Sequence, residues 1–125
     1  MHVLLIDDEA MVRKIVRKML ERQGHVVAEA ENGRIGLAKL REYSFDLVVT
    51  DIVMPEVEGL ELLTKVRQDR PSLPVVVMSG TGHSLALRSL EIASKLGATA
   101  VLQKPFASDA LAEAIYRSSG HCMVA

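Results

Sequence analysis

The sequence predicts an α/β fold with a five-stranded parallel sheet and helices on both of its faces. Short runs rich in β-branched and aliphatic residues alternate with longer helical patterns, which is typical of repeated βα units. Runs such as Leu47-Val48-Val49 and Val75-Val76-Val77 do not alternate with polar residues, so both faces of the sheet should be covered. The length of 125 residues and the 49% hydrophobic content suit one domain with one core, and a second folded domain will not fit.

Five βα units can be followed along the chain. The predicted strands are His2 to Asp7, Val26 to Ala30, Leu47 to Asp51, Val75 to Ser79 and Thr99 to Gln103. The predicted helices are Ala10 to Gln23, Gly33 to Glu42, Gly59 to Arg70, Ser84 to Leu96 and Ser108 to Ser118. Gly24 and Gly97 suit the left-handed residue that commonly follows a helix.

The first helix has a two-sided pattern. Its apolar stripe recurs at helical spacing and consists of Val12, Ile15, Val16 and Met19. The basic residues on its other face are Arg13, Lys14, Arg17 and Lys18. We expect this basic face to be solvated, with docking of an acidic kinase partner as the alternative.

Charge and composition exclude several classes of function. The formal charge of -1, from 15 basic and 16 acidic residues, gives no positive surplus for DNA or an anionic membrane, so we expect no direct nucleic-acid binding. The apolar run Val3 to Ile6 is interrupted at once by Asp7-Asp8-Glu9, and no run is long enough for a bilayer span. The single cysteine, Cys122, has no partner for an intrachain disulfide, which agrees with a reducing compartment. We therefore expect a cytoplasmic protein.

Polar side chains gather where the predicted strands end. In an open α/β sheet, ligands bind outside the carboxyl ends of the strands. Asp7 and Asp8 end the first strand, Asp51 the third and Ser79 the fourth, and Lys104 follows the fifth. Carboxylates this close repel one another unless a cation lies between them, which favours a hard divalent ion with oxygen ligands. Mg²⁺ is the natural candidate, with Mn²⁺ as an alternative.

This set of side chains suits phosphoryl transfer to a carboxylate. Mg²⁺ prefers one or two carboxylates together with water and phosphate oxygens, which leaves room for a phosphoryl donor beside Asp51. Lys104 could neutralise a second oxygen of the transferred group, and the Ser79 hydroxyl could donate to a third. The product would be an acyl phosphate on Asp51.

Each residue alone has a simpler interpretation. Asp7 and Asp8 could cap the first helix, and Asp51 could be a loop acid before the turn at Met54-Pro55. Capping does not explain acids on two strands together with a hydroxyl and a lysine on their neighbours. The four histidines, His2, His25, His83 and His121, lack metal-ligand spacing, and none is a candidate catalytic base.

The motifs at the strand ends resemble those of the response-regulator receiver family, which is CheY-like. The matching segments are Ile6-Asp7-Asp8-Glu9, Asp51-Ile52-Val53-Met54-Pro55 with Gly59, Ser79-Gly80, Gly97-Ala98 and Lys104-Pro105-Phe106. The resemblance covers residues 1–120 and leaves 121–125 as a tail. It implies a flavodoxin-like (βα)5 fold with strand order 2-1-3-4-5.

The resemblance also implies roles for these residues. Asp51 would be the phosphoacceptor, and the donor would be a histidine kinase or a histidine phosphotransfer protein. Asp8 and Asp51 would bind Mg²⁺ directly, Asp7 largely through water, and the carbonyl of Val53 would add a ligand. The Lys104–Pro105 bond would be cis, as proline permits. The protein would catalyse its own phosphorylation and dephosphorylation without turning over a separate substrate.

Phosphorylation would move Ser79 and the glycine-rich loop from Gly80 to His83. By resemblance, the surface of the fourth helix, fifth strand and fifth helix would then bind a downstream protein, or an effector domain missing from this chain. Receivers often carry an aromatic residue three positions before the lysine, where this chain has Val101. A small aliphatic side chain cannot swing in the same way, so the resemblance does not extend to an aromatic switch.

Other classes of protein make different demands on the sequence. A haloacid-dehalogenase phosphatase needs a second Asp where this chain has Val53, and a flavodoxin electron carrier needs a Ser/Thr-rich loop after the first strand. An adaptor with the receiver fold but without phosphorylation is the remaining alternative, although all five expected side-chain types are present. Because few residues follow the fifth helix, we expect no effector domain in this chain. A stand-alone protein and a piece of a larger regulator both fit.

Overall fold

A computed structural model describes residues 1–51, 58–79, 97–104 and 106–118. The five strands form one sheet in the order β2-β1-β3-β4-β5, and every neighbouring pair is parallel. The strands are β1 (His2–Ile6), β2 (Val26–Ala30), β3 (Leu47–Asp51), β4 (Val75–Ser79) and β5 (Ala100–Gln103). This order and the parallel pairing confirm the predicted fold.

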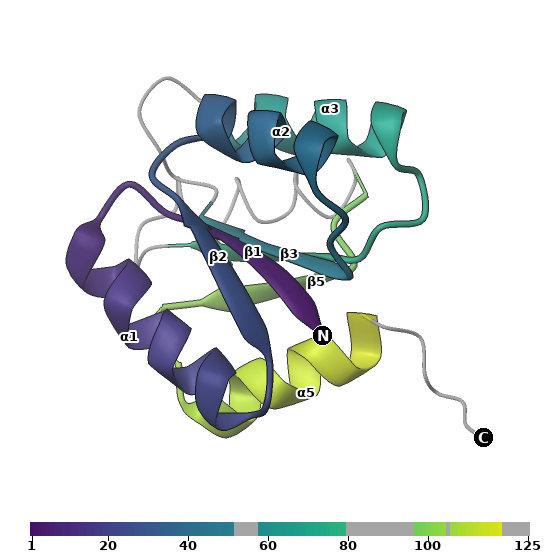
Figure 1. Ribbon diagram of the computed structural model, residues 1–125. Helices are drawn as coiled ribbons and strands as arrows, with labels where there is room; N and C mark the ends of the chain where they lie inside the picture. The colour runs from purple at the N-terminus through teal and green to yellow at the C-terminus, as the bar shows by residue number, and fades with distance from the viewer. Residues whose placement is uncertain (52–57, 80–96, 105, 119–125) are drawn as a thin grey trace.

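Helices cover the two faces of the sheet. The described helices are α1 (Ala10–Arg22), α2 (Gly33–Glu42), α3 (Glu58–Asp69) and α5 (Ser108–Ser118). α2 and α3 lie on one face, and α1 and α5 lie on the other (Figure 1). The helix predicted for residues 84–96 lies outside the described residues. None of the helices in the described part of the chain has the length and apolar character needed to cross a bilayer.

Several boundaries differ from the prediction by one residue. β1 ends at Ile6 because the Asp7 side chain accepts a hydrogen bond from the Glu9 N–H at 2.9 Å, which turns the chain away from the sheet. α1 ends at Arg22, α3 runs from Glu58 to Asp69, and β5 begins at Ala100. Gly24 and Gly97 have φ values of 91° and 108°, as predicted for left-handed positions.

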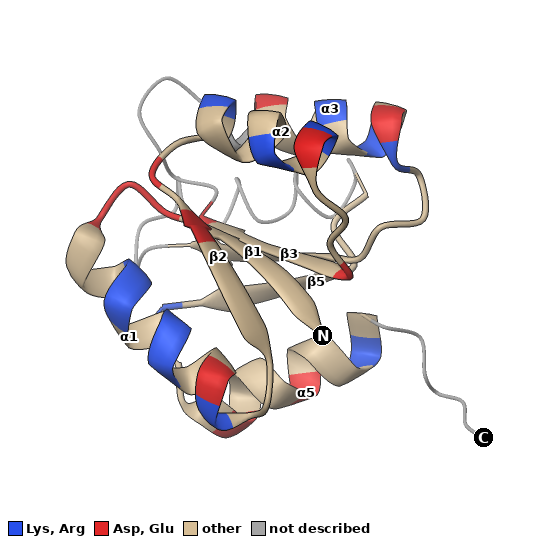
Figure 2. Ribbon diagram, in the orientation of Figure 1, with Lys and Arg blue, Asp and Glu red and all other residues tan. Residues whose placement is uncertain are grey.

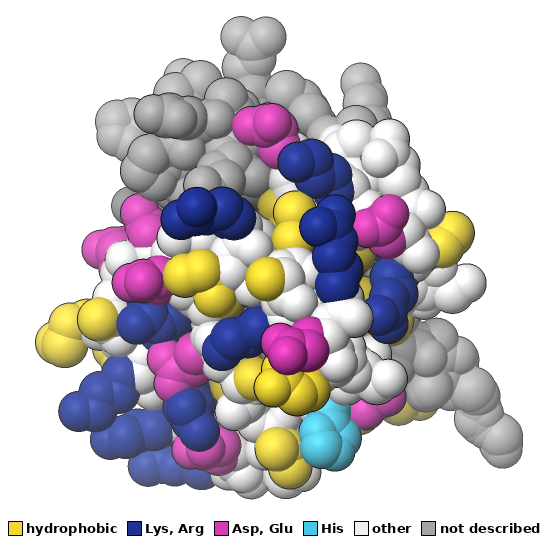
Figure 3. Space-filling view, turned by 45° about the horizontal axis from the view of Figure 1, so that its top comes forward, with side chains coloured by type: hydrophobic (Ala, Val, Ile, Leu, Met, Phe, Trp, Pro, Cys, Tyr) yellow, Lys and Arg dark blue, Asp and Glu magenta, His cyan; other side chains and the backbone are white. Residues whose placement is uncertain are grey.

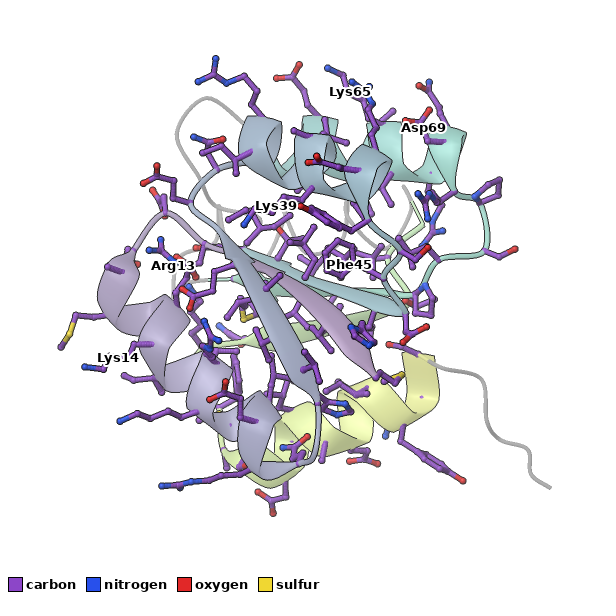
Figure 4. The ribbon with its side chains drawn as sticks, viewed as in Figure 1. Arg13, Lys14, Lys39, Phe45, Lys65 and Asp69 are labelled. Atoms are coloured by element: carbon purple, nitrogen blue, oxygen red, sulfur yellow. The ribbon has the colours of Figure 1, made fainter. Side chains whose placement is uncertain are left out.

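The hydrophobic core forms two layers rather than one, because the sheet separates them. Every residue of β3 and β4 is buried, and alternate residues point to opposite faces. Val48 and Val77 belong to the layer beneath α2 and α3, together with the partly buried Phe45, which Figure 4 labels. Val49 and Val76 belong to the layer beneath α1 and α5.

The apolar stripe of α1 is only partly buried. Val16 is 3% exposed and Leu20 is fully buried, whereas Ile15 is 53% exposed. Val16 and Leu20 are four residues apart and lie on the side of the helix that meets the sheet, while Ile15 is turned by about 100° from Val16. Val12, Ile15, Val16 and Met19 line one cavity, as the predicted stripe requires, and Ile15 lies at the exposed edge of this stripe.

Arg67 joins the end of α3 to two loops. Its guanidinium donates to the carbonyls of Gly97 (2.9 Å), Arg70 (3.1 Å), Pro71 (2.7 Å) and Leu73 (2.6 Å). Burial lowers the pKa of the Arg67 side chain, but a guanidinium remains protonated at neutral pH. The segments that lead into β4 and β5 are thus held by one cation.

We expect Arg67→Ala to lower the free energy of unfolding by roughly 2–3 kcal/mol, because four carbonyls lose a charged donor. Arg67→Lys should restore only part of this, since an ammonium cannot span the same carbonyls. Urea unfolding measures both values. Arg41→Ala is the control, because its contact with Asp69 is exposed and 4.0 Å long. Equal stability of Arg67→Ala and Arg41→Ala would contradict the role of Arg67.

Candidate functional site

The predicted polar residues meet at the carboxyl ends of the strands. Asp7 follows β1, Asp51 ends β3, and Ser79 ends β4. Strands paired in parallel register bring their ends to one edge, with Asp51 opposite Met78 and Ser79 opposite Gln103. Asp7 and Ser79 are fully buried, and Asp51 is 3% exposed. Figure 2 shows acidic residues along the connection between β1 and α1.

Lys104 connects the two buried carboxylates. Its Nζ lies 3.0 Å from Asp7 Oδ2 and 3.0 Å from Asp51 Oδ2, and its backbone N–H donates to the Ser79 carbonyl at 2.7 Å. Burial disfavours the charged ammonium, but the negative charge of Asp51 and the hydrogen bonds to both carboxylates outweigh it and raise the pKa of Lys104. The sequence predicted that Lys104 lies at this edge of the sheet. The structure shows in addition that Lys104 bridges the carboxyl ends of β1 and β3.

Four carboxylates at this edge could hold a divalent cation. Asp7, Asp8, Glu9 and Asp51 each offer one oxygen, and these oxygens all lie within 4.8 Å of one another. Asp8 and Glu9 are exposed, whereas Asp7 and Asp51 are buried. The oxygen-only donor set fits Mg²⁺ or Mn²⁺, which are hard cations. Glu9 was not predicted as a metal ligand, although its position directly after Asp7-Asp8 was the available signal in the sequence.

Helix capping does not account for the acidic pair. The N-cap residue of α1 is Glu9, and no side-chain hydrogen bond caps this end of the helix within the described residues. Asp7 instead uses Oδ1 to accept the Glu9 N–H and Oδ2 to accept Lys104. The two bonds fix the orientation of the Asp7 carboxylate within the site.

Arg13 supports the loop that carries the acids. Its Nη1 donates to the Asp7 carbonyl at 2.8 Å, and its Nε donates to Glu29 Oε1 at 3.0 Å. Arg17 also pairs with Glu29, and its hydrogen bond, helped by that of Arg13, lowers the pKa of Glu29 against the effect of partial burial. Figure 4 labels Arg13 near the start of α1, and Lys14 projects into solvent.

The basic face of α1 is therefore only partly solvated. Lys14 and Lys18 are exposed as predicted, but Arg13 and Arg17 are half-buried and paired with Glu29. Glu29 lies on β2, so its contact with α1 could not be read from the periodicity of the helix.

The remaining predicted site residues divide into two groups. Val53, Met54, Pro55, Gly80 and Pro105 lie outside the described residues. Gly59 lies in the first turn of α3, Val101 is 41% exposed on β5, and Phe106 packs against the layer beneath α1 and α5. The structure thus brings Asp7, Asp8, Asp51, Ser79 and Lys104 to one edge of the sheet.

Comparisons with known proteins agree with this geometry. Residues 3–116 match the model of the response regulator receiver domain. The chain is 36% identical over 118 residues to the chemotaxis protein CheY of Bacillus subtilis (strain 168), covering 93% of this chain and 95% of that protein. It is 37% identical over 105 residues to the protein-glutamate methylesterase/protein-glutamine glutaminase of Trichodesmium erythraeum (strain IMS101), covering 82% of this chain but only 30% of that longer protein.

A solved structure of a receiver domain protein is also similar to this chain. A response regulator receiver domain protein from Clostridium thermocellum superposes with a TM-score of 0.86 at 30% identity, covering 95% of this chain and 94% of that one. The similarity in fold therefore extends over nearly the full length of both chains.

The charge of Lys104 should contribute to stability in a defined pH range. We expect Lys104→Met to lower the free energy of unfolding by as much as about 3 kcal/mol at neutral pH, because two buried carboxylates lose their cation. The pKa of Lys104 is raised on folding, so its contribution is fully present below about pH 10.4 and is lost as the pH rises through the folded-state pKa. Chemical unfolding of both proteins measures this difference, and a difference that stays constant above pH 10.4 would contradict it.

Loss of Arg13 should loosen the acidic loop. We expect Arg13→Ala to lower the free energy of unfolding by about 1–3 kcal/mol and to weaken Mg²⁺ binding several-fold, because the Asp7 carbonyl loses its charged donor. Thermal melting and calorimetric titration with Mg²⁺ measure these effects. Lys14→Ala is the matched control, since its side chain is exposed. Unchanged Mg²⁺ affinity in Arg13→Ala would show that the bond to Asp7 does not orient the acids.

Proposed function

Because the chain belongs to the response regulator receiver domain family, we propose that it accepts a phosphoryl group on Asp51 from a phosphohistidine donor. The donor would be a histidine kinase or a histidine phosphotransfer protein. The observation that carries this proposal is the Lys104 ammonium at 3.0 Å from both Asp7 and Asp51, inside a cluster of acids. Receiver domains are signalling domains, and we propose that this one acts without turnover of a separate substrate.

In the proposed transfer, a carboxylate oxygen of Asp51 attacks the phosphorus of the donor. The new P–O bond gives an acyl phosphate, the P–N bond breaks, and its electron pair stays on the donor imidazole. Attack of water on the same phosphorus would release inorganic phosphate and restore Asp51.

Lys104 and Ser79 would bind the transferred group. Lys104 has a charged donor beside Asp51 and can neutralise a phosphoryl oxygen. Ser79 is fixed at the end of β4 by the hydrogen bond between its carbonyl and the Lys104 N–H. Its hydroxyl would donate to another phosphoryl oxygen, and this attraction would draw the following segment toward Asp51.

The acidic cluster would hold Mg²⁺, or alternatively Mn²⁺. We assign direct ligation to Asp8 and Asp51, ligation through water to Asp7, and a further ligand to the Val53 carbonyl. When bound, the cation would neutralise charge on the phosphoryl oxygens. The grouping of carboxylate oxygens within 4.8 Å supports this assignment.

Phosphorylation would change a binding surface made by the fourth helix, β5 and α5. On the described part of this surface, Val101 of β5 and Tyr116 of α5 are 41% and 64% exposed. The target would be a downstream protein or an effector domain, as the greater length of the Trichodesmium relative suggests. We propose residues 1–120 as the receiver domain and the cytoplasm as its location.

Acetyl phosphate with Mg²⁺ should add one acid-stable, base-labile phosphoryl group to the protein, and Asp51→Asn should abolish it. Lys104→Met should slow labelling by about 10²–10³-fold, because a charged donor to the transferred group is lost. Intact-protein mass spectrometry measures both. Glu42→Gln, at the exposed end of α2, is the control and should label normally. A phosphoryl label that persists in Asp51→Asn would show that Asp51 is not the acceptor. A wild-type protein that takes up no label would favour the alternative of an adaptor that has the receiver fold but is not phosphorylated.

A further inference from the structure

A second feature lies away from the phosphorylation site, between α2 and α3. A cleft of about 420 Å³ is lined by Gly33, Arg34, Leu37, Ala38, Arg41, Glu61, Leu62 and Lys65. Its floor is apolar and is formed by Leu37 and Leu62, which belong to the layer of core beneath the two helices. A smaller cavity of about 30 Å³ continues from Leu37 and Arg41 toward the C-terminal ends of both helices. Together they form an open groove along the two helices.

The rim of this groove carries an excess of positive charge. Arg34, Arg41 and Lys65 are exposed around the larger cleft, which Glu61 also lines, and the smaller cavity adds Arg70 and Asp69, so basic residues outnumber acidic ones along the groove. Arg41 has a long contact of 4.0 Å with Asp69, and neither Arg34 nor Lys65 has an ion-pair partner among the residues that the structure describes. The groove is thus positive on a chain whose formal net charge is -1. Figure 3 shows basic side chains on both sides of hydrophobic ones on this face.

We propose that this groove docks an acidic amphipathic helix of a partner protein. Arg34 and Arg41 are seven residues apart on α2, which places them two turns or roughly 10 Å apart along one face. Carboxylates at the same spacing on a partner helix would meet both, and an apolar side chain between them would lie over Leu37 and Leu62. Charge complementarity of this kind guides association and fixes the register of the partner.

The lining favours a protein segment over a small anion. Small-molecule sites enclose most of their ligand and place polar groups around it. Here the charged groups are the ends of exposed side chains on two helix faces, and the described lining includes no buried polar side chain. Such a groove suits an occupant that extends beyond it. The inference is independent of phosphorylation at Asp51.

The test uses selection of peptides by the full chain. Random peptides of roughly 16 residues, enough for four helical turns, are displayed and selected on the wild-type protein. The matched variants are Arg34→Glu/Lys65→Glu on the groove and Lys14→Glu/Lys18→Glu on α1, where both lysines are exposed. Both double variants change the net charge by the same amount. Thermal melting tests whether each variant is folded, and labelling with acetyl phosphate tests whether each can still be phosphorylated on Asp51.

We expect the selected peptides to be acidic with apolar residues at helical spacing, and to shift the amide signals of Gly33, Leu37 and Lys65 in NMR spectra. The groove variant should weaken their binding by about tenfold or more, whereas the α1 variant should bind within about twofold of wild type. Arg34→Gln/Lys65→Gln should give an intermediate loss. Because the charges are exposed, high salt should weaken binding as well.

Three outcomes would overturn the proposal. The first is selection of peptides without acidic residues, and the second is equal binding by the groove and α1 variants. The third is that ATP or inorganic phosphate shifts the groove amides while no acidic peptide is selected, because the occupant is then a small anion. Normal labelling of Asp51 alongside any of these would leave the proposed receiver function intact.

Discussion

The structure depends on one electrostatic constraint at the carboxyl edge of the sheet. Asp7 and Asp51 are buried side by side, and burial of two unpaired carboxylates is costly. Lys104, 97 residues along the chain from Asp7, places its ammonium 3.0 Å from both. The arrangement of β1, β3 and β5 is therefore tied to the same contact that prepares the site for a cation and a phosphoryl group. Folding and the proposed chemistry share these side chains.

The bounds of an element could be predicted from the sequence where its hydrophobic pattern agrees with its burial in the folded protein. β2, β3 and β4 have the predicted bounds, and every residue of β3 and β4 is buried, as their aliphatic runs predicted. Errors of one residue occur where a side chain decides the boundary, as Asp7 does for β1. Helical spacing predicted the apolar stripe of α1 but not that Ile15 would lie at its exposed edge. The two layers of the core agree with the predicted helices on both faces of the sheet, whereas the residues of each layer were assigned only by the structure.

Five of the side chains that the structure brings to the site were predicted from the sequence, but Glu9 and the contacts among them were not. Strand ends in a parallel sheet must meet, so Asp7, Asp8, Asp51, Ser79 and Lys104 could be grouped from sequence alone. The bridge made by Lys104 and the support of the Asp7 carbonyl by Arg13 require three-dimensional distances. Glu29 shows the reason most clearly, since it lies on β2 and yet neutralises two cations of α1. The groove between α2 and α3 likewise combines charges from separate helices.

The division of the core by the sheet has a consequence for how such a sequence can diverge. Neighbouring residues of β3, such as Val48 and Val49, belong to different layers, so a change in volume at one is accommodated by α2 and α3 and at the other by α1 and α5. Each helical pair can then accumulate substitutions against its own half of the strands. Surfaces on opposite sides of the molecule can evolve separately while the acidic edge between them keeps its geometry.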